Sequence, residues 1–136
     1  MRLVTDTPEI FSFFNEKSKA RELSLLPSLE LNSPEFSLIE IKEHQKDILK
    51  KFSLSEVQFT LIEKLLNATI KFSKEQEYSQ FLAEAKSISP DPDDSDFFAL
   101  ALKLNCPIWS EEKKLKNQPK VKIYSTSDLL KELGLK

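Results

Sequence analysis

Acidic side chains gather in a few short segments of this sequence, and together they could hold a divalent metal ion. In chain order they are Asp6, Glu40, Asp91, Asp93, Asp94, Asp96, Glu111 and Glu112. Carboxylates that share one crevice repel one another unless a cation lies among them. Carboxylate oxygens are hard ligands that suit Mg²⁺ or Mn²⁺, and such an ion can activate water against a phosphodiester bond.

The segment 89–110 contains the densest group of acids and organises the rest of the chain. Pro90 and Pro92 prevent a helix from starting much before Asp93, so the aspartates lie at the first turn of the helix that follows. The simplest interpretation is that they only cap this helix. Capping does not account for four aspartates, and the apolar run 97–102 predicts a buried helix that carries its acidic end into the middle of the protein.

Strand and helix patterns alternate along the chain, which predicts how these acids are positioned. We expect strands at 2–5, 29–32, 68–72, 108–110 and 121–124. We expect helices at 9–15, 19–26, 33–52, 55–67, 75–86, 97–104 and 127–133. The alternation predicts an α/β protein, a single three-layer domain over residues 1–136 with a central parallel sheet flanked by helices. Ligands of such sheets bind outside the carboxyl ends of the strands, where Asp6, Glu40 and Glu112 are expected.

Composition limits the possible functions. The 136 residues are 40% hydrophobic and 31% charged, which excludes disordered and fibrous classes. A net charge of −2 argues against bulk coating of nucleic acid, but not against a nuclease whose metal ions meet the phosphate. The single cysteine, Cys106, cannot form an intramolecular disulfide, and the first residues include no long apolar segment. We therefore expect a cytoplasmic protein without a membrane segment.

Four stretches of the sequence resemble the PIN-domain nucleases, namely residues 3–7, 34–41, 91–110 and 121–124. By this resemblance the chain is a PIN-like domain, and members of the family are Mg²⁺- or Mn²⁺-dependent ribonucleases, many of them VapC-like toxins of toxin–antitoxin pairs. The resemblance implies an RNA substrate and an antitoxin partner. It implies the catalytic residues Asp6, Glu40, Asp94 and Glu112, and the metal ligands Asp6, Asp94, Asp96 and Glu112.

Two positions depart from the family pattern. The family usually has Asn where this chain has Pro8, and its last acid is usually Asp where this chain has Glu111 and Glu112. Glu112 fits the family spacing better. Because of these departures, a PIN-fold binding module with a weakened pocket, acting through RNA or protein partners, remains the alternative to an active endoribonuclease.

Other chemistries find less support in the sequence. His44 could join the site from one turn beyond Glu40, but the one histidine is more simply explained by packing or solvent exposure. A phosphohydrolase with a nucleophilic Asp6 commonly needs a second Asp two residues later, where Pro8 stands. The basic residues Lys113, Lys114 and Lys116 could contact a phosphate backbone or could be only a solvated face.

The expected helix over 55–67 is apolar on two sides, which predicts a homodimer. Val57, Leu61 and Leu65 lie on one side. Phe59, Ile62 and Leu66 lie on the other, and we expect this second side to meet another copy of the chain.

Overall fold

The computed structural model describes residues 1–135, and they contain one sheet of five parallel strands. The strands are β1 (Arg2–Thr5), β2 (Glu30–Pro34), β3 (Ile70–Ser73), β4 (Ile108–Trp109) and β5 (Ile123–Tyr124). Their order across the sheet is β3-β2-β1-β4-β5, with Leu3 opposite Leu31 and Val4 opposite Ile108. The direction of chain progress therefore reverses between β1 and β4, where sites of open parallel sheets form.

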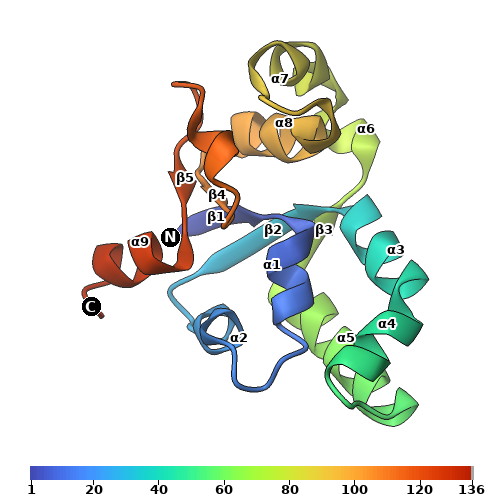
Figure 1. Cartoon of the computed structure of the whole chain (residues 1–136). Helices are drawn as coiled ribbons and strands as arrows, with labels where there is room; N and C mark the ends of the chain where they lie inside the picture. Colours follow the sequence, from blue (N-terminus) through green and yellow to red (C-terminus); the bar gives the residue numbers. More distant parts are fainter. Residues whose placement is uncertain (136) are drawn as a thin grey trace.

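Helices cover both faces of the sheet (Figure 1). The α-helices are α1 (Thr7–Ser12), α2 (Lys19–Ser24), α3 (Glu35–Glu43), α4 (Gln45–Lys51), α5 (Glu56–Thr69), α6 (Glu75–Tyr78), α7 (Leu82–Ile88), α8 (Ser95–Leu104) and α9 (Thr126–Glu132). Short 3-10 helices are η1 (Ser79–Phe81), η2 (Pro92–Asp94) and η3 (Lys113–Lys116). Figure 1 places α7 and α8 on one face of the sheet and α1, α2 and α9 on the other.

Two apolar clusters fill the spaces between these three layers. Leu3 and Trp109 belong to the cluster under α1, α2, α5 and α9, whereas Val4 and Ile108 belong to the cluster under α7 and α8. Neighbouring residues of one strand point to opposite faces, so each short strand contributes to both clusters. The expected α/β class with a central parallel sheet is confirmed.

Two expected helices are broken, and the prediction of single long helices was wrong there. The helix expected over 33–52 is interrupted at His44, whose backbone has φ of −99° and ψ of 17°, and it resumes as α4. Ser33 does not cap this helix, since it lies in β2 and its hydroxyl donates to the Thr5 carbonyl. The helix expected over 75–86 is interrupted by η1, where the Tyr78 backbone leaves the helical region.

The buried helix expected after the aspartates is α8. Phe98, Ala99 and Leu100 are completely buried in it, and Asn105 ends it in the left-handed conformation, with φ of 52°. Because α8 packs against β1, β2 and β4, its first turn lies at the edge of the sheet that Asp6 also occupies.

Helix α5 begins with the capping box expected from the sequence, in which Ser55 and Gln58 bond each other's backbone amides. The prediction of its outer face was wrong. Phe59 and Leu66 are buried, whereas Val57, Leu61 and Leu65 remain 69%, 60% and 42% exposed. The side that carries Phe59 and Leu66, which was expected to meet another copy of the chain, therefore faces the core.

Over residues 1–135, no helix has both the length and the apolar character needed to cross a membrane.

Candidate acidic site

Asp6 follows β1 directly and lies at the switch point of the sheet. Its side chain is 3% exposed, and its Oδ1 accepts a hydrogen bond from the Glu9 amide at 3.0 Å, which caps α1. Burial raises the pKa of Asp6 to about 6, with smaller contributions from Asp94 and Glu112, although hydrogen bonds from Ser110 and Glu9 lower it. Asp6 therefore experiences the charge of acids from two distant segments.

Asp94 occupies the N-cap position of α8, yet its carboxylate makes no capping hydrogen bond. Burial raises the pKa of Asp94 to about 6, followed by repulsion from Glu112 and Asp91. Asp91, by contrast, accepts a hydrogen bond from the Asp93 amide at 3.0 Å and starts η2 as a cap. Capping thus explains Asp91 but not Asp94.

Ser110, at the end of β4, links the acids across the switch point. Its buried hydroxyl accepts a hydrogen bond from the Glu112 amide at 3.0 Å and also forms a hydrogen bond with Asp6. The two glutamates that follow point to different places: Glu111 Oε1 accepts the Thr126 amide at 2.6 Å, whereas Glu112 raises the pKa values of both aspartates. We call Asp6, Asp94 and Glu112 the acidic cluster.

Glu40 lies on α3 and reaches the same edge of the sheet through a chain of hydroxyl groups. Thr7 Oγ1 lies 3.4 Å from Glu40 Oε1 and 3.1 Å from Ser37 Oγ. Ser33 Oγ in turn lies 3.0 Å from Ser37 Oγ. Sequence reasoning missed these hydroxyls, although polar residues at the ends of buried strands were a visible signal.

Asp96 is bound by Tyr78. The Tyr78 hydroxyl donates to Asp96 Oδ2 at 2.6 Å, and Tyr78 is completely buried between α6 and α8. Burial and the Asp96 carboxylate raise the pKa of Tyr78 far above its usual value. The expected metal ligand Asp96 is therefore placed as a partner of Tyr78.

Glu9 is a buried acid that sequence reasoning missed. It is 5% exposed, and burial, Asp6 and Glu111 raise its pKa to about 8. Its Oε1 lies 3.4 Å from Thr126 Oγ1, which also accepts the Trp109 indole N–H at 3.1 Å. The spacing of Asp6 and Glu9, an acid three residues after a cap, was the available signal. Trp109 itself is completely buried in the core.

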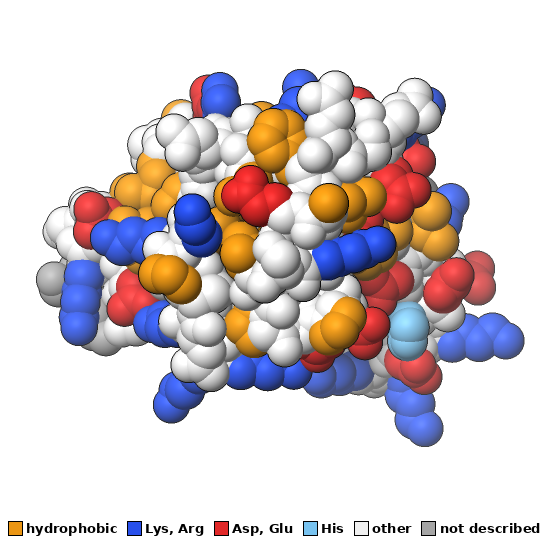
Figure 2. Space-filling model, turned by 90° about the horizontal axis from the view of Figure 1, so that it is seen from above, with side chains coloured by type: hydrophobic (Ala, Val, Ile, Leu, Met, Phe, Trp, Pro, Cys, Tyr) orange, Lys and Arg blue, Asp and Glu red, His pale blue; other side chains and the backbone are white. Residues whose placement is uncertain are grey.

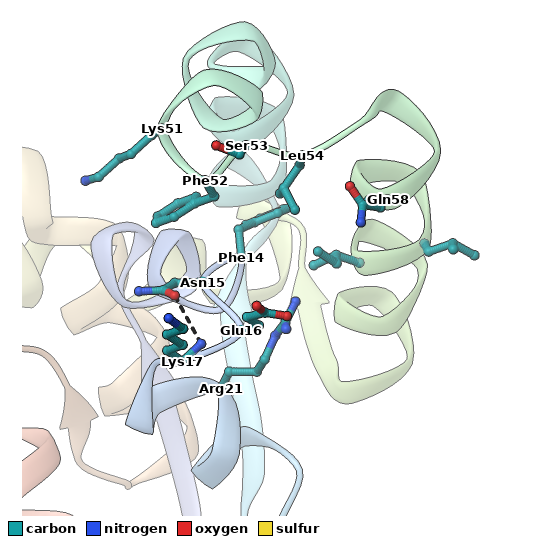
Figure 3. Close-up of a pocket in the computed structure, with 12 residues that line it drawn as sticks. Phe14, Asn15, Glu16, Lys17, Arg21, Lys51, Phe52, Ser53, Leu54 and Gln58 are labelled. Atoms are coloured by element: carbon teal, nitrogen blue, oxygen red, sulfur yellow. Dashed lines mark hydrogen bonds between the residues drawn. The ribbon is translucent and has the colours of Figure 1, made fainter.

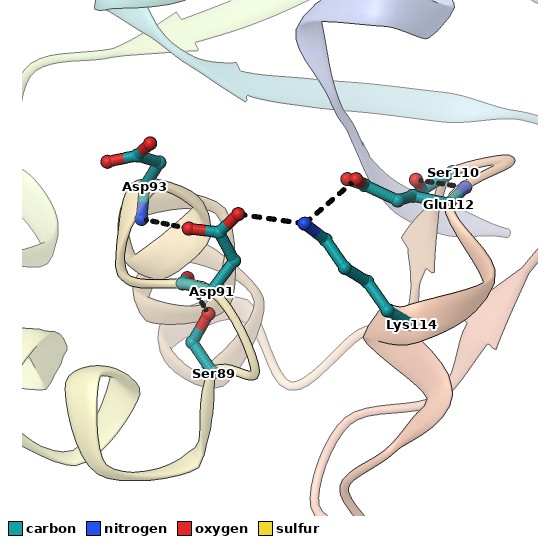
Figure 4. Close-up of polar contacts among 6 residues, drawn as sticks. All are labelled: Ser89, Asp91, Asp93, Ser110, Glu112 and Lys114. Atoms are coloured by element: carbon teal, nitrogen blue, oxygen red, sulfur yellow. Dashed lines mark hydrogen bonds and ion pairs between the residues drawn. The ribbon is translucent and has the colours of Figure 1, made fainter.

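The lysines expected to contact nucleic acid are partly engaged within the chain. Lys114 Nζ lies 2.8 Å from Asp91 Oδ2 and 3.3 Å from Glu112 Oε1 (Figure 4). Lys116 Nζ lies 3.1 Å from Asp128 Oδ2. Lys113 is exposed.

The carboxylate oxygens at this edge of the sheet are the type of ligand that a hard divalent cation prefers. Within residues 1–135, no three His, Cys, Asp or Glu side chains stand close enough to hold a metal ion, so the carboxylates would have to draw together around one. Glu112 is nevertheless close enough to raise the pKa values of Asp6 and Asp94, and the Lys114 ammonium already lies between two acids as a stand-in cation. In Figure 2, acidic side chains gather on the right of the face shown, around the pale blue histidine. That residue, His44, packs edge-on against Phe11 and is exposed.

Comparisons with known proteins agree with this geometry. The sequence model of the PIN domain matches residues 4–133. A chain of the crystal structure of VapBC2 from Rickettsia felis, bound to a DNA fragment from their promoter, superposes with a TM-score of 0.62. The two chains are 15% identical, and the match covers 92% of this chain and 98% of the other. No curated protein matches the sequence.

Proposed function

Because the chain belongs to the PIN-domain family, we propose that it is a metal-dependent endoribonuclease that hydrolyses RNA phosphodiester bonds at the acidic cluster. The observation that carries this proposal is the placement of Asp94. It takes the cap position of a buried helix without capping it, and it turns its carboxylate toward acids from β1 and from the turn after β4. Repulsion of this kind costs stability, and a cation relieves it.

Each residue of the site has a part in this proposal. Asp6, Asp94 and Glu112 would hold Mg²⁺ or Mn²⁺, and Glu40 would complete the site from α3. When bound, the ion lowers the pKa of water and stabilises the leaving oxygen. Ser110 fixes the turn that presents Glu112 and holds Asp6 at the same time. Pro8 is exposed and cannot offer the amide side chain that the family usually has there, so Ser110 and the Glu9 amide are the groups that orient Asp6.

We also propose that the protein is the cytoplasmic toxin of a toxin–antitoxin pair. A groove of about 640 Å³ lies between the end of α1 and helices α4 and α5 (Figure 3). Phe14, Phe52, Leu54 and Ile62 give it an apolar lining. Lys17, Arg21 and Lys51 line it together with a single acid, Glu16. An antitoxin segment with apolar and acidic side chains would complement this groove in shape and charge.

Cleavage of single-stranded RNA in Mn²⁺ tests the proposed activity. Wild-type protein should cleave. Asp6→Asn should lower the rate by more than ~100-fold, because it removes a metal ligand, and even the loss of a residue that only hydrogen-bonds a ligand lowers activity by about 10- to 100-fold. Asp47→Asn, a change at an exposed acid on α4, is the matched control and should cleave like wild type. If wild type and Asp6→Asn are equally inactive on every RNA, the protein is instead the silent binding module.

The exposed side of α5 predicts how the protein dimerises. Val57, Leu61 and Leu65 form the exposed apolar stripe, so Leu61→Lys should convert a dimer into a monomer in light scattering. Asn67→Lys, at an exposed position off this stripe, should leave the dimer intact. A wild-type protein that is monomeric at high concentration, or a Leu61→Lys variant that still dimerises, would contradict the assignment.

A further inference from the structure

Lys114 connects the two chain segments that flank the acidic cluster. It lies in η3, and its ammonium reaches Asp91 Oδ2 at 2.8 Å and Glu112 Oε1 at 3.3 Å. Figure 4 shows the side chain extending from η3 toward the turn before α8, with Glu112 on its other side. Asp91 and Lys114 are far apart in sequence, so the contact exists only in the folded chain.

The ammonium also acts on an acid that it does not contact. It lowers the pKa of its partner Asp91, and it opposes the repulsion that raises the pKa of Asp94. Its side chain is 47% exposed, and a lysine stem is flexible, so the ammonium can leave this place without disturbing the core. Lys114 is thus an exposed positive charge held by the acids at the edge of the cluster.

We propose that Lys114 is the resident cation of the acidic cluster, and that a divalent ion must displace its ammonium from Glu112 in order to bind. The inference rests on the proposed metal site. A divalent ion held by Glu112 would lie beside the ammonium, and two cations held by neighbouring carboxylates repel each other. Lys114 therefore sets the metal affinity of this protein and neutralises part of the cluster when no ion is bound.

Calorimetric titration with Mn²⁺ tests this role. Lys114→Met should bind Mn²⁺ about tenfold more tightly than wild type, because the bound ion no longer displaces or repels the ammonium. Lys113→Met removes the same charge at the neighbouring exposed position and should tighten binding by less than about twofold. Lys114→Arg keeps the cation and should bind Mn²⁺ with wild-type affinity. The rise in melting temperature on adding Mn²⁺ should follow the same order.

The outcomes separate this inference from the proposed function. Equal Mn²⁺ affinity of wild type, Lys114→Met and Lys113→Met would overturn the role of Lys114 while leaving the metal site in place. Equal tightening by Lys114→Arg and Lys114→Met would also overturn it, because the charge would then be irrelevant. If none of the four proteins binds Mn²⁺, the metal site itself is overturned, and the inference with it.

Discussion

Replacing Asp94 with Asn should abolish Mn²⁺ binding and RNA cleavage and should stabilise the metal-free protein. Burial and neighbouring acids raise the pKa of Asp94 from 3.8 to about 6, so the protein loses stability as the pH rises through that range, and the full cost is present above it. A neutral Asn removes this cost and caps a helix about as well as Asp. Since Asp94 is partly exposed, the gain at pH 7 should be about 1 kcal/mol, a rise of roughly 4 °C in melting temperature.

The neighbouring acid supplies the control for this experiment. Asp93 is exposed and lies one residue before Asp94, so Asp93→Asn should change neither the melting temperature nor the cleavage rate appreciably. Cleavage by Asp94→Asn should fall by more than ~100-fold. A variant at position 94 that cleaves like wild type would show that Asp94 is only a helix-end residue.

The metal-free protein should lose stability as the pH rises from about 6 to about 8, and Glu9→Gln should remove most of this loss. The folded pKa of Glu9 is raised from 4.5 to about 8 by burial, Asp6 and Glu111. The native state therefore binds a proton that the unfolded state has already lost, and unfolding becomes easier as the pH increases. The loss between pH 6 and 8 should be about 2 kcal/mol, and the full effect, counted from the unfolded pKa and reached above the folded pKa, about 5 kcal/mol.

Urea unfolding at a series of pH values measures this effect. Asp6 and Asp94 titrate near pH 6, so the loss that remains between pH 6 and 8 should come chiefly from Glu9. Glu9→Gln should flatten the profile there, whereas Glu16→Gln, at an exposed position, should keep the wild-type slope. Lower stability of Glu9→Gln than of wild type at pH 8 would mean that the charged Glu9 holds the fold together.

Local signals allowed much of the fold to be predicted from the sequence. The proline at the start of α1, the capping box of α5 and the apolar run of α8 each act through residues close in the chain. Alternation of strands and helices then implied a parallel sheet. The same reasoning predicted that the acids lie together, because side chains that follow parallel strands meet at one edge.

Features that depend on distant partners could not be predicted in this way. Asp96 turns to Tyr78 because the two helices that carry them pack together. Glu9 is buried by α9, which comes more than a hundred residues later, as its contact with Thr126 shows. The exposed side of α5 depends on which neighbours cover the helix. Periodicity alone gave two apolar sides and no means of choosing between them.

Calorimetric titration of Mn²⁺ into the wild-type protein and into the double variant Asp6→Asn, Asp94→Asn tests the central claim most directly. The claim is that carboxylates from β1, from the start of α8 and from the turn after β4 share a divalent ion. Wild type should bind Mn²⁺ at or below millimolar concentration, and the double variant should give no binding heat while remaining folded. Identical heats from the two proteins, or no binding by wild type at millimolar Mn²⁺, would contradict it.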